Sequence, residues 1–227
     1  MQNFYIKVIV EGNEEEMFFS IVKELGTNDI FYLDIENSGG YGRIGDCFLS
    51  ALREGDLYDC ILCVYDVDNK IGDPKSPYNL TRSQLNLLFG DEKITDKVSF
   101  CTNPNILQLI LLFADKLDNV KLNTTSKTSN TKLVHNYWPK IASGKLDDKG
   151  RKIKSDYDAS SWQLEIIKYS ILNGVYSYDS LFENAHTLPD NYKKLLPSSN
   201  VIKLLIALKD GDKEFFNSIR DAIETID

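Results

Sequence analysis

Three acidic residues follow two of the most apolar segments in this 227-residue chain. Glu11 comes directly after residues 4–10 (FYIKVIV), and Asp66 and Asp68 close residues 57–65 (LYDCILCVY). Short β-branched and aromatic runs of this kind predict buried strands. In open parallel sheets, ligands bind in the crevice outside the carboxyl ends of the strands. If the two strands are neighbours, we therefore expect the three carboxylates to converge on one edge of the sheet.

Metal binding is the chemistry that this group favours. Residues two apart in an extended segment point to the same side, so Asp66 and Asp68 are expected to reach one cation. Clustered carboxylates raise one another's pKa values unless a cation neutralises them. Oxygen ligands without His or Cys favour Mg²⁺ or Mn²⁺ over zinc. Glu15, four residues after Glu11, is either a further metal ligand or a Glu favoured by a helix dipole.

Each of these features alone also has a plainer interpretation. A Glu-Gly pair after a strand is usually just a turn, and an isolated Asp-x-Asp occurs by chance in many surface loops. The joint arrangement, with one strand-helix unit between the two acidic strand ends, is rarer.

The elements that must position these residues alternate between strand and helix. Predicted strands cover 4–10, 30–35, 57–65 and 97–101, and predicted helices cover 13–25, 46–53, 81–89 and 104–117. This alternation predicts an α/β fold with a mainly parallel sheet flanked by helices. We interpret the glycine-rich segment 38–46 (SGGYGRIGD) as a flexible loop near the site.

The character of the chain changes near residue 122. Residues 1–122 form the α/β pattern, whereas residues 123–227 are expected to be a mostly helical C-terminal region with a basic loop. The helical patterns of this region cover 162–172, 178–185, 201–208 and 215–226.

Charge is distributed unevenly along the chain. The 26 Lys and Arg against 34 Asp and Glu residues give a net charge of −8, which speaks against a general nucleic-acid coat. Residues 121–170, however, hold ten basic against five acidic residues. This region is either a solvated surface or a contact for a phosphate backbone. The candidate phosphate contacts are Arg43, Lys70, Arg151, Lys152 and Lys154.

Hydropathy and the character of the N-terminal segment predict a cytoplasmic protein without a membrane partner. No apolar run reaches about 18 residues, and the N-terminal segment has an acidic cluster where a signal peptide has small residues. The four cysteines are interpreted as buried thiols, since Cys60 and Cys63 would lie on opposite faces of a strand.

The order strand, EGNEE, helix, and later strand, DVDN, resembles the Toprim domain of topoisomerases, primases and OLD-related nucleases. That family has a strand-terminal Glu followed by Gly, and a later Asp-x-Asp. Residues 99–113 (SFCTNPNILQLILLF) and the opening VIVEGNEEEMFF are similar to segments of the RloB-like proteins, small bacterial Toprim proteins linked to restriction and phage defence. The resemblance covers residues 1–115.

The resemblance implies a Mg²⁺-dependent nuclease, a hydrolase of phosphodiester bonds in DNA or tRNA. Glu11, Asp66 and Asp68 match the catalytic and metal-binding positions of the family. It further implies an effector of antiviral defence or abortive infection that works with an ABC-type ATPase. The alternative is a non-catalytic subunit of such a complex that senses metal or nucleotide, which the acidic net charge mildly supports.

Overall fold

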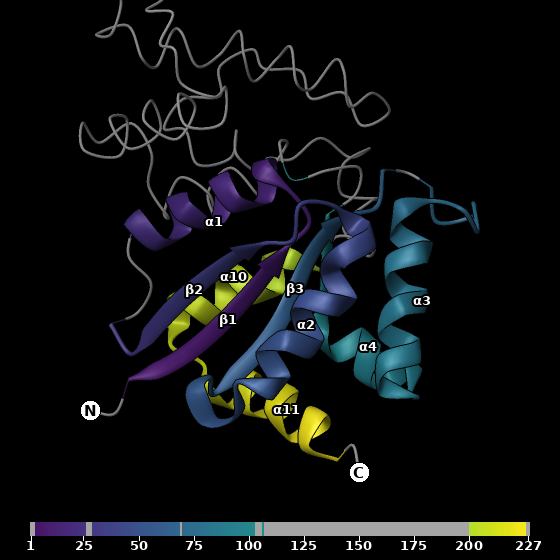
Figure 1. Cartoon of the computed structure of the whole chain (residues 1–227). Helices are drawn as coiled ribbons and strands as arrows, with labels where there is room; N and C mark the ends of the chain where they lie inside the picture. The colour runs from purple at the N-terminus through teal and green to yellow at the C-terminus, as the bar shows by residue number, and fades with distance from the viewer. Residues whose placement is uncertain (1–2, 26–28, 69, 103–105, 107–199, 226–227) are drawn as a thin grey trace, which may run out of the picture.

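The computed structural model describes residues 3–25, 29–68, 70–102, 106 and 200–225 (Figure 1). Of the predicted helix at 104–117 only residue 106 is described. The predicted helices at 162–172 and 178–185, and the boundary near residue 122, lie outside the described residues.

A four-stranded parallel sheet forms the centre of the described structure (Figure 1). Its order is β2-β1-β3-β4, and the strands are β1 (Phe4–Val10), β2 (Phe31–Asn37), β3 (Cys60–Asp66) and β4 (Ser99–Thr102). All three neighbouring pairs are parallel, which confirms the predicted α/β class. β1 and β3 are direct neighbours, with Val10 opposite Val64. The residues that follow these two strands therefore meet at one edge.

Three strands differ in extent from the prediction, and one of them is β4, which runs over Ser99–Thr102 where the sequence predicted 97–101. β2 continues to Asn37, where the sequence predicted an end at residue 35. β3 begins only at Cys60, because Gly55–Leu57 form a 3₁₀ turn with Gly55 at φ 64°. A residue without a side chain adopts this left-handed conformation at little cost. Every residue of β3 is buried, as expected for a central strand covered on both faces.

Helices pack along the sheet on both sides. α1 (Asn13–Leu25) packs beside β2, while α2 (Ile44–Arg53) covers β1 and β3 and lies in front of the sheet in Figure 1. α1 buries Met17, Phe18 and Val22, which recur at helical spacing.

The connection between β3 and β4 holds two helices rather than the one predicted. α3 (Pro77–Phe89) begins at a Ser76 cap, whose hydroxyl accepts a hydrogen bond from the Asn79 amide at 3.2 Å. It ends at Gly90 with φ 67°, and α4 (Glu92–Val98) starts at once behind an Asp91 cap. The helix α4 was not predicted from the sequence, because its seven residues are too few to show a clear helical spacing of apolar residues.

The last described residues belong to the same hydrophobic core as the sheet. α10 (Val201–Asp210) and α11 (Lys213–Glu224) lie behind the sheet in Figure 1, close to the predicted helical segments 201–208 and 215–226. The ring of Phe216 is 4.8 Å from that of Phe31 and 6.0 Å from that of Phe4. These contacts join the C-terminal end of the chain to the first two strands.

Asn200, just before α10, pairs with the backbone of β4. Its side-chain oxygen accepts a hydrogen bond from the Cys101 amide at 2.6 Å, and its side-chain nitrogen donates to the Ser99 carbonyl at 2.9 Å. The side chain thus satisfies polar groups along an edge of the described sheet, where unpaired groups are otherwise exposed.

Candidate functional site

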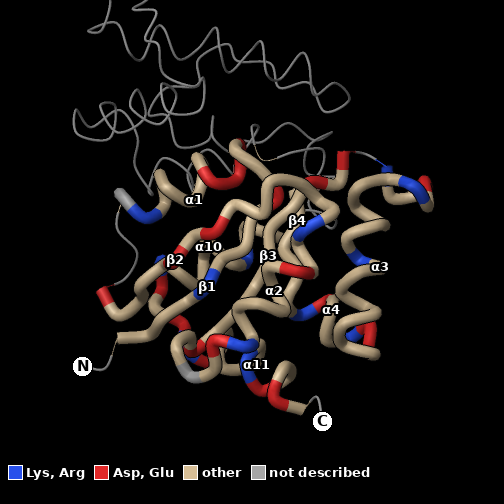
Figure 2. Tube along the Cα trace, viewed as in Figure 1, with Lys and Arg blue, Asp and Glu red and all other residues tan. Residues whose placement is uncertain are grey.

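A pocket of about 350 Å³ opens at the carboxyl ends of β1, β2 and β3. Four of the nine residues that line it are acidic, and the acidic start of α1 stands out in Figure 2. The lining residues are Glu11, Gly12, Asn13, Glu14, Glu15, Asn37, Gly39, Gly40 and Asp66. The pocket lies at the edge where the sequence analysis predicted a ligand site.

Glu11 and Asp66 are in direct contact in this pocket. The Asp66 amide donates a hydrogen bond to Oε2 of Glu11 at 3.1 Å, and the Glu11 amide donates to the Val64 carbonyl at 3.0 Å. Glu11 continues the ladder of β1 by one residue, so its side chain emerges beside the end of β3. The expectation that these two acidic residues meet is therefore confirmed.

The carboxylate of Asp66 is buried and held by two donors. Only 5% of this residue is exposed. Its Oδ1 accepts a hydrogen bond from the Thr102 hydroxyl at 2.7 Å and another from the Ile106 amide at 2.9 Å. Donors of this kind stabilise the ionised carboxylate and fix its orientation.

Glu15 lies in the first turn of α1 and is 3% exposed. Its Oε2 accepts a hydrogen bond from the Gly12 amide at 3.0 Å, which is half of a capping box. Burial, followed by the charges of Asp66 and Glu11, raises the pKa of Glu15 well above its ordinary value. Glu15 therefore caps the start of α1 and also belongs to the acidic group that lines the pocket.

The glycine-rich segment after β2 closes one side of the pocket. Ser38 donates its amide hydrogen to the Val10 carbonyl at 2.9 Å, and its hydroxyl lies 3.1 Å from the carbonyl oxygens of Glu11 and Gly40. The Gly40 amide donates to the same Glu11 carbonyl at 2.8 Å, and φ is 132° at Gly40. These bonds tie the loop to the end of β1, and the chain turns helical already at Tyr41.

Asn37 is a part of the site that the sequence analysis missed. Its side-chain nitrogen donates to Oδ1 of Asn13 at 2.9 Å and to Oε2 of Glu16 at 2.7 Å, while its side-chain oxygen accepts from the Gly39 amide at 2.8 Å. It therefore links β2, the glycine-rich loop and α1. The one sequence signal was an amide residue at a strand end.

Asp68 is placed differently from Asp66. β3 ends at Asp66, so Asp68 lies in a turn with φ 54° rather than in an extended segment. The expectation that Asp66 and Asp68 point to the same side assumed an extended segment, and it does not apply in a turn. Asp68 is half-buried and is not among the residues lining the pocket.

The two predicted basic contacts within the described residues lie on exposed connections after β2 and β3. Arg43 ends a 3₁₀ turn before α2, and the Lys70 amide donates to the Val67 carbonyl at 3.0 Å. Arg151, Lys152 and Lys154 lie outside the described residues.

The donor set of the pocket suits a hard divalent cation. Its side chains offer carboxylate and amide oxygens, and none of the nine lining residues is Lys, Arg or His. In the described part of the chain, no three His, Cys, Asp or Glu side chains are arranged as a ready group of metal ligands. The Glu11 carboxylate instead accepts a hydrogen bond from the backbone of Asp66.

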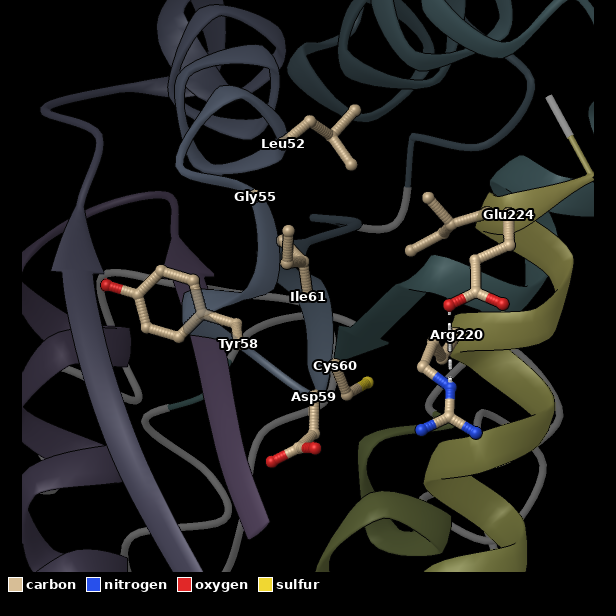
Figure 3. Close-up of a pocket in the computed structure, with 9 residues that line it drawn as sticks. Leu52, Gly55, Tyr58, Asp59, Cys60, Ile61, Arg220 and Glu224 are labelled. Atoms are coloured by element: carbon tan, nitrogen blue, oxygen red, sulfur yellow. Dashed lines mark ion pairs between the residues drawn. The ribbon is translucent and has the colours of Figure 1, made fainter. Parts of the chain in front are cut away.

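A second pocket, of about 330 Å³, lies at the amino end of β3 between α2 and α11 (Figure 3). Its charged groups are engaged by neighbours. Oδ2 of Asp59 accepts a hydrogen bond from the Tyr5 amide at 2.7 Å, and Nε of Arg220 lies 3.7 Å from Glu224 on the same helix. In Figure 3 the Tyr58 hydroxyl points away from the Arg220 side chain. Polar groups do not converge here as they do around Glu11.

The cysteines are free and buried, as predicted. Burial raises the pKa values of the Cys60 and Cys63 thiols, and raises that of Cys101 to about 12. Thiols in this state are poor nucleophiles, since the thiolate is the reactive form.

Among the described residues, no helix combines the length and apolar character needed to cross a membrane. Comparisons of the chain with protein-family models, with curated proteins and with solved structures found no match.

Proposed function

We propose that this chain is a divalent-metal-dependent hydrolase of phosphodiester bonds in nucleic acid, of the Toprim type that its sequence resembles. One observation carries the proposal. Three of the four carboxylates that line the pocket at the carboxyl edge of the parallel sheet belong to Glu11, Glu15 and Asp66. They come from the ends of two neighbouring strands and the start of a helix, which is where α/β proteins bind ligands.

Electrostatics favour a cation in this pocket. Glu15 and Asp66 are almost completely buried. Burial first, and then the charges of Asp66 and Glu11, raise the pKa of Glu15. Buried carboxylates that repel one another are relieved by a neutralising ion. Mg²⁺ or Mn²⁺ fits the all-oxygen donor set.

Glu11 and Asp66 would hold such an ion, with Glu15 as a further ligand. The sequence resemblance adds Asp68, which lies in the turn after β3 and outside the lining of the pocket. When bound, a divalent ion polarises a phosphate and makes a water molecule more acidic. The chain contributes the orientation of the ligands: Thr102 and Ile106 hold Asp66, and the Asp66 amide holds Glu11.

The substrate and partner assignments rest on the family resemblance. DNA or tRNA is the proposed substrate, and Arg43, Lys70 and the basic residues Arg151, Lys152 and Lys154 are proposed to meet its phosphates. An ABC-type ATPase is the proposed partner in a cytoplasmic antiviral system. The free, buried thiols suit a reducing compartment.

A cleavage assay tests this function. The purified full-length chain would be incubated with duplex DNA, single-stranded DNA and tRNA in Mg²⁺, in Mn²⁺ and in EDTA, with and without an ATPase encoded beside it. We expect cleavage that needs a metal and is lost in Asp66→Asn. Asp210→Asn is the matched control, because Asp210 is exposed at the end of α10.

Metal-independent cleavage, or equal activity of the Asp66→Asn variant, would contradict the proposed site. Metal binding without cleavage of any substrate, even with the partner, would support the non-catalytic sensing role instead.

A further inference from the structure

Thr102 is the last residue of β4 and lies opposite Asp66, the last residue of β3. Only 1% of Thr102 is exposed, and its hydroxyl donates to Oδ1 of Asp66 at 2.7 Å. Its carbonyl accepts from the Val67 amide at 2.8 Å, so Thr102 contacts the end of β3 through both side chain and backbone. This residue does not line the pocket around Glu11.

Two hydrogen bonds to the Asp66 carboxylate, from Thr102 and Ile106, reach the same oxygen. The Thr102 hydroxyl and the Ile106 amide donate to Oδ1, at 2.7 and 2.9 Å. Two donors on one oxygen fix the plane of the carboxylate, and with it the direction of Oδ2. Hydrogen bonds from neutral donors to an ionised group are among the stronger ones in proteins.

We propose that Thr102 is a positioning residue of the acidic site, whose hydroxyl sets the orientation in which Asp66 receives a divalent cation. The inference rests on the proposed function, because it takes Asp66 as a metal ligand. The Ile106 amide is a backbone donor that stays in place when the side chain of residue 102 is changed. The Thr102 hydroxyl supplies the second fixed point, from the neighbouring strand.

Valine tests this role because it matches threonine in shape but has no donor. Loss of a partner that orients a metal ligand typically weakens metal affinity by roughly 10- to 100-fold. We expect Thr102→Val to weaken Mn²⁺ binding by roughly that factor. Thr102→Ser keeps the hydroxyl and should restore the affinity of the unchanged chain.

Thr95 offers a matched control. It is fully buried in α4, and its hydroxyl has no hydrogen-bond partner in the described structure. Thr95→Val makes the same chemical change away from the pocket, so Mn²⁺ affinity should stay unchanged.

The experiment measures Mn²⁺ binding to the full-length chain by calorimetry and by the electron paramagnetic resonance of free Mn²⁺, together with each melting temperature. Weaker binding in Thr102→Val, rescued by Thr102→Ser and absent from Thr95→Val, supports the inference. If Thr102→Val does not fold, Thr102→Ala takes its place in the same comparison.

Three failures are distinguishable. Equal Mn²⁺ affinity of folded Thr102→Val and the unchanged chain overturns the positioning role and leaves the proposed function standing. An unchanged chain that binds no Mn²⁺ overturns both. A chain that binds Mn²⁺ with the expected Thr102 dependence but cleaves nothing overturns the nuclease proposal alone.

Discussion

The backbone amide of Asp66 donates a hydrogen bond of 3.1 Å to the carboxylate of Glu11, although the two residues are 55 positions apart in the chain. The contact exists because β1 and β3 are neighbours, with Val10 at the end of β1 opposite Val64, two residues before the end of β3. It places one acidic side chain directly over the backbone of another. The proposed metal site therefore depends on the strand order of the sheet as well as on the acidic residues.

Replacing Glu11 by glutamine separates its charge from its hydrogen bond. The amide oxygen of Gln can still accept from the Asp66 amide, whereas the negative charge is lost. We expect Glu11→Gln to keep the fold, with an unchanged or higher melting temperature because one repulsive charge is gone. Metal-dependent cleavage should fall by at least about 100-fold.

Cleavage assays and thermal unfolding of the same preparation check this prediction. A large fall in melting temperature together with the loss of cleavage would indicate that Glu11 is structural. Undiminished cleavage would remove Glu11 from the site.

Glu15 should make stability depend on pH in the metal-free protein. Burial and the charges of Asp66 and Glu11 raise its pKa in the folded state above the ordinary value of 4.5. A carboxyl group with a raised folded pKa binds more protons in the folded than in the unfolded state, so its contribution to stability falls as pH rises above about 4.5. The fall ends once the pH exceeds the folded pKa.

Glu15→Gln removes this titration and retains an acceptor for the Gly12 amide. We expect the variant to be more stable than the unchanged chain at neutral pH, by a margin that shrinks toward pH 4.5. Urea unfolding in EDTA at a series of pH values measures the difference. A margin independent of pH would contradict the raised pKa.

The sequence predicted those parts of the fold in which each segment carries its own signal. Residues 4–10 are apolar except for Lys7 and end at Glu-Gly, and β1 has those bounds. The meeting of Glu11 and Asp66 followed from the same reasoning once β1 and β3 proved to be neighbours. That β1 and β3 lie next to each other was assumed rather than predicted, because strand order depends on packing between distant segments.

Other parts of the site had no such local signal. Thr102 and Asn37 act on residues of other elements, through bonds that only the folded sheet brings together. Asp68 was expected in an extended segment, but β3 ends two residues before it and the chain turns there. The packing of α11 on β1 and β2 also joins residues from opposite ends of the chain.

Phe216 should be necessary for the stability of the sheet, although it lies near the C-terminal end. It is fully buried and its ring packs against Phe31 and Phe4. We expect Phe216→Ala to lower the free energy of unfolding by roughly 3–5 kcal/mol, as for other buried aromatic residues. Phe216→Leu fills most of the space and should cost less.

Urea unfolding followed by circular dichroism measures both Phe216 variants. A loss below about 1 kcal/mol in Phe216→Ala would mean that α11 is not an integral part of this core.

Lys7 should stabilise the fold without affecting the site. It is 7% exposed, and its amine lies 2.8 Å from Asp34 and 3.0 Å from Glu36. Burial acts to lower the pKa of Lys7, but its hydrogen bonds to these carboxylates outweigh burial and raise the pKa. Lys7→Met leaves two like charges side by side on β2, which should cost about 1–2 kcal/mol.

The melting temperature of Lys7→Met should fall, whereas its Mn²⁺ affinity should equal that of the unchanged chain. Calorimetric titration of the folded variant checks this. Weakened Mn²⁺ binding would contradict this prediction, because it would show that the charged groups around Lys7 affect the pocket.

The basic segment of the chain provides the test of nucleic-acid binding. Lys145, Lys149, Arg151, Lys152 and Lys154 lie within ten residues. Such a concentration of charge is either solvated or meets an anion, and phosphate is the anion that the proposed chemistry requires. We expect the triple change of Arg151, Lys152 and Lys154 to Ser to weaken binding to all nucleic-acid sequences alike. The log–log salt dependence should flatten by up to about three units, roughly one per lost phosphate contact.

Fluorescence anisotropy with labelled DNA and tRNA at several salt concentrations measures both effects in the full-length triple variant. Changing Lys203, Lys209 and Lys213 to Ser is the matched control, since it removes the same charge from the described C-terminal helices. If this control weakens nucleic-acid binding less than the first triple variant does, the loss comes from local phosphate contacts rather than from the change in net charge. If affinity and salt slope of the first triple variant equal those of the unchanged chain, the basic segment is a solvated surface, and phosphate recognition must come from Arg43, Lys70 or the partner.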